Sequence, residues 1–212
     1  MTSPLTLVSL PLFPLHTVLF PGGTLSLQVF EPRYRSMVRC CREQDMPFGI
    51  VTLLDGEEVQ RPGAPAERFH PVGTIARIDS VTPQGDGVER VACRGVDRFR
   101  IQQTRKLASG QWVADAQLLP ADAPYPIPDD LQHSAATLQQ VWSRLSPAPC
   151  PPAGAALWAD CSWVANHWCE LLPMDPLLQL QWLQVDSPLL RLELVTDALE
   201  QAGIVLPQHT KT

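Results

Sequence analysis

The chain is poor in lysine and has no cysteine spacing typical of a metal site. Its only lysines are Lys106 and Lys211, and neither follows a glycine-rich turn, so there is no P-loop to hold nucleotide phosphates. No motif places a serine beside either lysine, which argues against a Ser-Lys dyad. None of the six cysteines belongs to a C-x-x-C pair or has a histidine three or four residues away. We therefore expect no metal site and no cofactor.

A long hydrophobic run and a basic N-terminal region are also missing. Prolines from Pro4 to Pro21 interrupt the apolar start before it reaches a membrane-spanning length. The sequence predicts neither a signal peptide nor a membrane helix, so the cytoplasm is the expected location. Six cysteines suggest disulfides only in a short secreted chain, and here Cys40 and Cys41 are adjacent, so we expect reduced thiols.

Charge is distributed unevenly along the chain. Residues 1–118 carry 13 Lys and Arg against 12 Asp and Glu, whereas residues 119–212 carry 3 against 10. The acidic second half is a poor surface for nucleic acid. The stretch from Arg90 to Lys106 is locally basic, although Glu89 and Asp97 dilute it. Binding of RNA by the first half therefore stays open as an alternative.

Short apolar runs between turn residues fill residues 1–118 and predict a compact β domain, closed as a barrel or a sandwich. Pro21-Gly22-Gly23 predicts a type II turn, and with it a hairpin. The stretch Asp55–Pro71 has no period and is predicted to be a long surface loop. The predicted strands are Leu5–Leu10, Val18–Phe20, Leu25–Phe30, Phe48–Leu54, Val72–Val81, Val88–Cys93, Arg98–Thr104 and Trp112–Leu118.

A helix is predicted to begin at Pro32, because proline suits the first helical turn. Tyr34, Met37, Val38 and Cys41 follow at the spacing of one helical face, which predicts that these four side chains are buried.

Four prolines in residues 119–130 predict an extended connector between a β domain, 1–118, and a helical domain, 131–212. Local start and stop signals divide the second domain into a bundle of about four helices. These signals are Asp129 and Asp130 as caps of a helix ending near Leu145, a break at 146–152, a helix from Gly154 to Leu172, the N-cap pairs Asp175-Pro176 and Ser187-Pro188, and a stop at Gly203.

The run from Phe13 to Met37 carries a specific family resemblance. FPL at 13–15, LFPG at 19–22 and FEPRY at 30–34, followed by Met37, resemble the opening of the Lon N-terminal domain. The chain looks like a stand-alone bacterial domain of this type, without the ATPase and protease domains of Lon. Further similar segments follow in the family's order, namely Val72–Ile78, Arg94–Ile101, Leu171–Asp175 and Ser187–Leu194 with Arg191.

This resemblance implies an α+β fold, in which a PUA-like β pseudo-barrel is followed by a C-terminal helical bundle. It also implies a binding module that is not an enzyme, similar to the part of Lon that helps to recognise protein substrates. Unfolded or extended polypeptides are the expected partners, and a separate protease is a further candidate. Because PUA-like barrels elsewhere serve RNA, an RNA-binding protein is the alternative, although the charge argues against nucleic acid.

Six residues are candidates for contact with a partner. Glu31 and Arg33 lie between an apolar strand and a helix, although the dipole at the helix N-terminus is the simpler explanation of Glu31. Strand alternation puts two arginines on one face, where pairing with acids is simpler than contact with a ligand. Tryptophans in the helical half are explained first by core packing and second by a patch that faces a partner. The candidates are Glu31, Arg33, Arg98, Arg100, Trp158 and Trp163.

A hydrolase has no supporting motif. Folding could bring Cys40 or Cys41 near His16 or His70, but isolated Cys and His in apolar surroundings usually serve packing. We therefore expect no catalytic residues.

Overall fold

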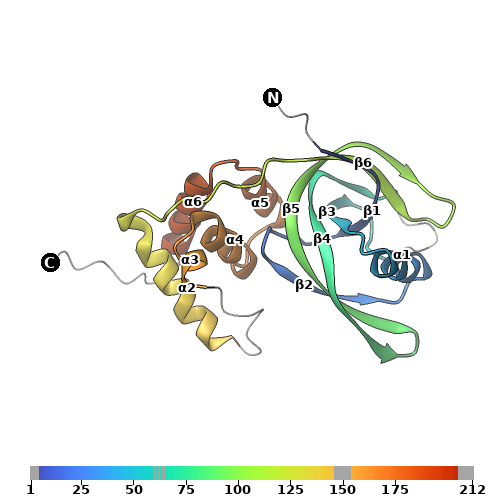
Figure 1. The fold of residues 1–212 in the computed structure, drawn as a ribbon, viewed down its shortest axis with the longest axis horizontal. Helices are drawn as coiled ribbons and strands as arrows, with labels where there is room; N and C mark the ends of the chain where they lie inside the picture. The colour runs from blue at the N-terminus through green and yellow to red at the C-terminus, as the bar shows by residue number, and fades with distance from the viewer. Residues whose placement is uncertain (1–4, 60, 62, 64, 146–153, 205–212) are drawn as a thin grey trace. The chain divides into compact units, whose positions relative to one another are not determined.

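The structure is a computed structural model that describes residues 5–204 except 60, 62, 64 and 146–153. The chain forms two compact units, Met1–Ala121 and Asp122–Thr212 (Figure 1). We call the first the β unit and the second the helical unit. Strands precede helices along the chain apart from one helix within the β unit, and the predicted α+β fold class is confirmed.

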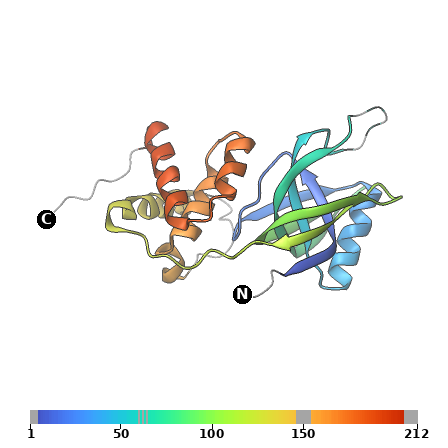
Figure 2. The ribbon, with the colours of Figure 1, turned by 90° about the horizontal axis from the view of Figure 1, so that it is seen from above.

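One mixed sheet wraps around the β unit (Figure 2). Its strands are β1 (Thr6–Leu15), β2 (Thr24–Val29), β3 (Phe48–Asp55), β4 (Arg68–Gly85), β5 (Val88–Lys106) and β6 (Trp112–Leu118). Neighbours follow the order β2-β5-β4-β3-β1-β6, and an additional β5–β6 pairing closes the sheet into a pseudo-barrel. β1 and β3 run parallel, while the other pairs are antiparallel.

β5 is a single strand of 19 residues, where the sequence predicted two, Val88–Cys93 and Arg98–Thr104. Gly95 lies between those two stretches. A Cβ atom there would sit 2.2 Å from the carbonyl oxygen of Phe20, so only glycine allows this close approach. The Gly95 N–H donates to the carbonyl of Gly23 at 2.9 Å. The uninterrupted strand can therefore pair with β2, β4 and β6.

The predicted hairpin between Val18–Phe20 and Leu25–Phe30 is wrong, although its turn is present. Gly22 has the expected positive φ, at 84°. Val18–Phe20 is not a strand, and β2 pairs with β5 instead. The hydroxyl of Thr74 donates to the carbonyl of Leu19 at 2.5 Å. A side chain, not a neighbouring strand, thus satisfies a polar group of this buried segment.

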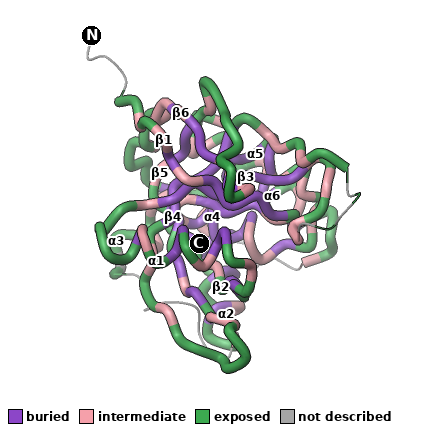
Figure 3. The backbone as a smooth tube through the Cα atoms, turned by 90° about the vertical axis from the view of Figure 1, so that its right-hand side faces the viewer, coloured by how far each residue is buried: buried purple, intermediate pink, exposed green. Residues whose placement is uncertain are grey.

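Two further boundaries differ from the prediction. β1 continues beyond Leu10 to Leu15, because its second half pairs with β3 in parallel, from Leu12↔Gly49 to Leu15↔Thr52. The predicted loop Asp55–Pro71 is shorter, since β4 already begins at Arg68. Figure 3 shows the resulting burial: β3 is buried over most of its length, whereas the β4–β5 hairpin ends in exposed residues.

The helix of the β unit, α1 (Pro32–Glu43), starts where the sequence predicts, with Pro32 in its first turn. All four side chains of the predicted stripe, from Tyr34 to Cys41, are buried. They join a core cluster that includes Phe13 and Phe48. The apolar face of α1 is thus fixed against the sheet.

The helical unit contains, among its described residues, one 3-10 turn and five α-helices. These are η1 (Asp129–Leu131), α2 (Gln132–Arg144), α3 (Ala155–Trp158), α4 (Cys161–Leu171), α5 (Pro176–Leu183) and α6 (Pro188–Gln201). The count exceeds the predicted four because Asp160 divides the expected helix Gly154–Leu172. Its carboxylate accepts the backbone N–H of Trp163 at 2.9 Å and so caps α4.

Some of the predicted helix caps and helix ends are confirmed, and others are wrong. Asp175 and Ser187 accept the N–H groups of Leu177 and Leu190 and cap α5 and α6, as predicted. Gly203 follows the last helix with a φ of 69°. Asp129 and Asp130 do not cap α2, since both lie within η1. The predicted break at 146–152 lies outside the described residues.

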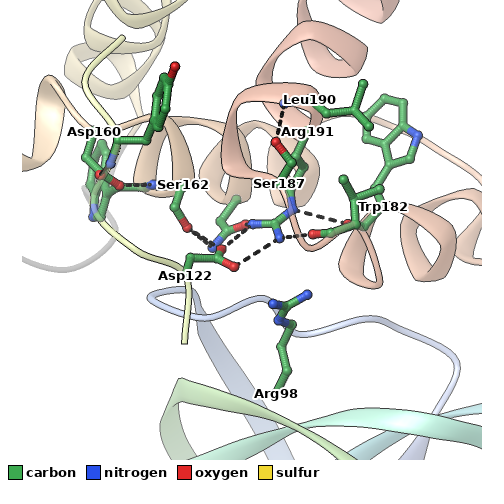
Figure 4. Close-up of polar contacts among 12 residues, drawn as sticks. Arg98, Asp122, Asp160, Ser162, Trp182, Ser187, Leu190 and Arg191 are labelled. Atoms are coloured by element: carbon green, nitrogen blue, oxygen red, sulfur yellow. Dashed lines mark hydrogen bonds and ion pairs between the residues drawn. The ribbon is translucent and has the colours of Figure 1, made fainter. Parts of the chain in front are cut away.

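A buried arginine holds the polar interior of the helical unit together (Figure 4). Arg191 is 1% exposed, and its guanidinium donates to the carboxylate of Asp122 at 2.6 Å and to the side-chain oxygen of Asn166 at 2.8 Å. It also donates to the carbonyls of Trp182 and Val185, at 3.2 and 2.5 Å. The start of this unit is therefore tied to its last helix.

Candidate binding groove beside strand β2

β2 is the one strand of the sheet that pairs along a single edge in the described part of the chain. Its only neighbour there is β5, with the register Thr24↔Arg94 to Val29↔Glu89. Leu27 and Val29 are buried, while Ser26 and Gln28 are exposed. An antiparallel pairing engages the backbone groups of alternate residues only, so half of the N–H and C=O groups of β2 face away from β5.

A groove of about 340 Å³ runs along this strand. Seven consecutive residues from Leu25 to Glu31 line it. Because alternate side chains of a strand point to opposite faces, consecutive residues share one cavity only where the cavity follows the strand edge. The remaining lining residues are Phe13, Leu15, Thr17, Tyr34, Glu58 and Val59.

Aromatic stacking makes the wall opposite β2 rigid. The rings of Phe13 and Tyr34 stack with centroids 4.1 Å apart and an interplanar angle of 9°. Phe48 touches Phe13 from the core side, with centroids 6.4 Å apart. Burial raises the pKa of Tyr34, more than Arg33 lowers it, so the phenol is neutral at physiological pH. The wall is therefore apolar and firmly packed.

A buried ionic cluster supports the groove at the start of α1. Arg33 is 6% exposed, and its guanidinium nitrogens lie 3.2 Å from a carboxylate oxygen of Glu31 and 3.0 Å from one of Glu67. Glu67 also accepts hydrogen bonds from the ammonium of Lys106 at 2.5 Å and the indole of Trp112 at 2.7 Å. Desolvation by itself would raise the pKa of Glu67, but these hydrogen bonds outweigh it and lower that pKa.

The cluster joins segments that are distant in sequence. Arg33 also donates to the carbonyl of Gly110 at 3.1 Å, in the β5–β6 turn. Glu58, on the segment after β3, accepts the backbone N–H of His16 at 2.6 Å through its carboxylate. Three loops are thus held around one end of the groove.

The four predicted candidates of the β unit lie in different surroundings. Glu31 lines the groove and Arg33 lies directly behind it. Arg98 is buried and donates to the carbonyl of Pro120 at 3.3 Å, whereas Arg100, two residues further along β5, is exposed. Glu31 makes no side-chain cap of α1 and pairs with Arg33 instead.

Trp158 and Trp163 belong to the helical unit, where they pack in an aromatic cluster. Their ring centroids lie 4.5 Å apart, and Trp142 touches both at 5.9 and 5.7 Å. His167 stacks on Trp163 with a centroid distance of 3.9 Å, and its pKa is lowered by burial. Trp158 and Trp163 are both half-buried, so packing within this cluster covers part of each ring.

Among the described residues, the thiols of Cys41, Cys93 and Cys161 donate to backbone carbonyls, and no hydrogen bond joins a cysteine to a histidine. Burial raises the pKa of the Cys41 thiol to about 11, opposite to the shift of a reactive nucleophile. His70 accepts the nearby N–H of Val72, and His16 is exposed. Among the described residues no group of three or more His, Cys, Asp or Glu could hold a metal ion. Within the same residues, no helix is long and apolar enough to cross a membrane.

Sequence reasoning missed the groove itself. The FEPRY motif drew attention to Glu31 and Arg33, but Glu58 and Glu67 lie in a stretch without a period. The uncharged β2 sequence, Thr24–Val29, was the available signal, because an unpaired strand edge normally carries a lysine or a proline. That signal becomes readable only when the partners of β2 are known.

Comparison with known proteins places these features in a family. The model of the ATP-dependent protease La (LON) substrate-binding domain matches residues 9–201. In structure, the chain is similar to a Lon N-terminal domain protein from Xanthomonas campestris, with 33% identity, a TM-score of 0.71 and coverage of 90% of this chain and 98% of that one. The N-terminal domain of a Mycobacterium avium complex Lon protease shares the fold, with 16% identity, a TM-score of 0.58 and coverage of 89% and 96%.

Curated relatives are much longer than the matched region. Cereblon from Xenopus tropicalis is 29% identical over 162 residues, which are 74% of this chain and 33% of cereblon. Lon protease 2 from Myxococcus xanthus is 33% identical over 93 residues, which are 43% of this chain and 11% of that protease. The similarity thus covers about a third or less of these relatives.

Proposed function

Because the chain belongs to the family of ATP-dependent protease La (LON) substrate-binding domains, we propose that it binds unfolded or extended segments of other proteins and performs no chemical step on them. The groove along the free edge of β2 is the observation that supports this most. Its apolar walls can bury apolar side chains, and extended chains are known to bind at exposed strand edges. Folded proteins keep most such segments inside, which favours unfolded partners.

The lack of a chemical step is part of this proposal. The matching family model describes a substrate-binding domain, and no protease domain is evident in this chain. Any cleavage of the bound segment would then need a separate protease, which we propose as a second partner. The cytoplasm is the proposed location.

Nucleic acid is a weaker candidate for the partner. An RNA reader usually presents a stripe of basic residues with exposed aromatic rings. In the β unit, the Arg94 guanidinium lies 3.1 Å from a carboxylate oxygen of Asp79, and Arg98 is buried. Retention of a labelled single-stranded RNA at low salt, lost steeply as salt rises, would favour this alternative.

Titration of a labelled unfolded protein tests the proposed function. A reduced and carboxymethylated model protein, kept unfolded by its modification, is mixed with increasing amounts of the full chain, and fluorescence anisotropy is followed. We expect saturable binding in the micromolar range, and no binding of the same protein in its native form. Lack of saturation, or equal binding of the native form, would contradict the proposal.

Two variants test whether the unfolded protein binds in the groove. Phe30 lines the groove and is 48% exposed, whereas Met46 is 39% exposed and does not line it. Phe30→Ser should weaken binding about tenfold, since roughly 1–2 kcal/mol of apolar burial is lost. Met46→Ser is the matched control and should leave the affinity within about twofold, as an exposed site away from the contact. Equal effects of the two variants would place the binding surface elsewhere.

A further inference from the structure

We propose that the segment held in this groove adds to β2 as a further strand, and that it carries alternating apolar side chains and a basic side chain that faces Glu58. This inference rests on the proposed function and names the geometry and the chemistry of the bound segment. It depends on the direction of the β2 backbone groups, the composition of β2, the walls of the groove and the charge of its lining.

The backbone of β2 offers free hydrogen-bonding groups on the groove side. The carbonyl of Gly23 accepts from Gly95 at 2.9 Å, and the carbonyl of Leu25 accepts from the Cys93 thiol at 3.5 Å, so both point toward β5. Groups that face one neighbour recur at every second residue of an antiparallel strand. Those of Ser26 and Gln28 therefore face the opposite edge, and no partner for them is found in the described residues.

β2 also lacks the features that normally protect a free edge. Proteins shield such edges with lysine, proline, a bulge or a covering element, since an unpaired edge invites pairing with another chain. Thr24–Val29 contains no charged residue and no proline, and its register with β5 is regular over all six residues. Within the described residues of the β unit, a cavity lies along this edge and no strand or helix pairs with it. Such an edge is suited to pairing with an added strand.

Only an extended segment can use both the edge and the walls. A helix has its own N–H and C=O groups paired internally and offers none to β2. A strand lies about 4.8 Å from its neighbour and sends alternate side chains to opposite faces. One set of these side chains would meet the apolar wall formed by Phe13, Leu15 and Tyr34. The other set would lie on the face of Ser26 and Gln28, which is exposed.

The charge of the lining selects a basic residue. Glu31 and Glu58 are the charged residues among those that line the groove. The guanidinium of Arg33 balances Glu31 at 3.2 Å. Glu58 accepts the backbone N–H of His16 at 2.6 Å, and no cation among the described residues forms an ion pair with it. A lysine or arginine of the bound segment would complement this carboxylate.

Backbone methylation of a peptide separates strand addition from other kinds of binding. The probe is the labelled peptide TVKVTVT, titrated into the full chain. One methylated isomer carries N-methyl groups on its three valines, and the other carries them on its lysine and its last two threonines, so each loses three N–H donors. Strand addition predicts that one isomer loses about tenfold or more in affinity, because several edge hydrogen bonds are lost, while the other stays within about threefold.

The outcomes distinguish this inference from the proposed function. If the unmodified peptide binds and both isomers bind equally well or equally poorly, strand addition is wrong and the proposed function stands. If the peptide fails but the unfolded protein binds, the same conclusion holds. If neither binds, the proposed function itself is wrong. A doubled mass in light scattering, abolished by Ser26→Pro, would show that a second copy of this chain occupies the edge and would overturn the inference.

Glu58→Gln tests the basic residue without removing the acceptor for His16. The peptide TVKVTVT should bind the natural chain about two- to fivefold more tightly than a peptide with norleucine in place of lysine, as expected for a solvent-accessible ion pair. This preference should disappear in Glu58→Gln and at high salt. A preference that persists unchanged in Glu58→Gln would assign the charge selection to another residue and contradict this part of the inference.

Ser26→Pro tests the edge from the protein side. Proline removes a donor that faces away from β5, so the β2–β5 pairing can remain, as for prolines on natural edge strands. We expect a loss of peptide affinity of about fivefold or more with an unchanged circular dichroism spectrum. Unchanged affinity in a folded Ser26→Pro variant would overturn the inference, and the methylated peptides decide the question if the variant does not fold.

Discussion

The two units each bury an arginine, but they surround it differently. In the helical unit, Arg191 is enclosed by Asp122, Asn166 and two backbone carbonyls, so the polar groups satisfy one another. In the β unit, Arg33 joins two glutamates directly behind a groove, and the strand edge beside this groove has no partner strand among the described residues. Enclosed polar groups contribute to stability only, whereas groups that stay unpaired beside a cavity are available to a ligand.

Arg191→Met breaks the enclosed network and should have the largest effect on stability. The carboxylate of Asp122 would stay buried and keep its hydrogen bond from Ser162 but lose its ion pair with Arg191, which costs about 3–5 kcal/mol. Urea denaturation followed by tryptophan fluorescence measures this loss, because five of the six tryptophans lie in the helical half. Arg94→Met is the matched control: its pair with Asp79 is half exposed, and its loss should cost at most about 1 kcal/mol. If the two variants lost similar amounts of unfolding free energy, the proposed difference between the enclosed and the exposed ion pair would be wrong.

Glu67→Gln probes the corresponding network of the β unit. We expect a loss of about 1–3 kcal/mol at neutral pH, because hydrogen bonds to an ionised group are replaced by weaker ones. The pKa of Glu67 is lowered in the folded chain. Its contribution is therefore complete above the unfolded value of about 4.3 and is lost as the pH falls below that value toward the folded pKa.

The difference in unfolding free energy between the natural chain and Glu67→Gln, measured by urea denaturation from neutral to acidic pH, isolates this residue from the other carboxylates. We expect the difference to shrink as the solution becomes acidic. A difference that stays constant over that range would mean that the ionisation of Glu67 does not stabilise the β unit.

Asp175→Ala and Asp129→Ala should have the smallest effects on stability, because each changes one side chain at the start of one helical turn. The Asp175 carboxylate accepts the N–H of Leu177 at 2.7 Å, so its removal should cost about 1 kcal/mol. Asp129 makes no capping bond and should cost less than about 0.5 kcal/mol. Thermal unfolding of the two variants measures both. A larger loss for Asp129→Ala would contradict the assigned caps.

Local signals predicted the beginnings and ends of several elements correctly. Pro32 marked the start of α1, Ser187-Pro188 the start of α6, and Gly203 the end of the last helix. Each signal acts within a few residues of its own position, through a cap, a fixed φ or a positive φ. The buried stripe of α1 was readable for the same reason, since its period lies within one helix.

Wrong predictions concern contacts between residues that are distant in sequence. Val18–Phe20 has the composition of a strand, yet its Leu19 carbonyl is satisfied by Thr74, far along the chain. The break expected within β5 is absent, because Gly95 has no side chain and lets the strand pass close to the backbone of Phe20. The same limit applies to the residues of the groove. A sequence motif indicated Glu31 and Arg33, whereas Glu58 lies in a segment without periodicity and was not predicted.

By itself, the sequence determined the order of strands and helices, the turn at Gly22, most helix starts and the family to which the chain belongs. Tertiary structure alone decided that β2 pairs with β5 and, within the residues that the structure describes, with no other strand. It also decided that Glu67 binds Arg33, Lys106 and Trp112. The physical reason is that caps and turns depend on neighbouring residues, whereas strand partners and buried charge depend on which distant segments the closed sheet brings together.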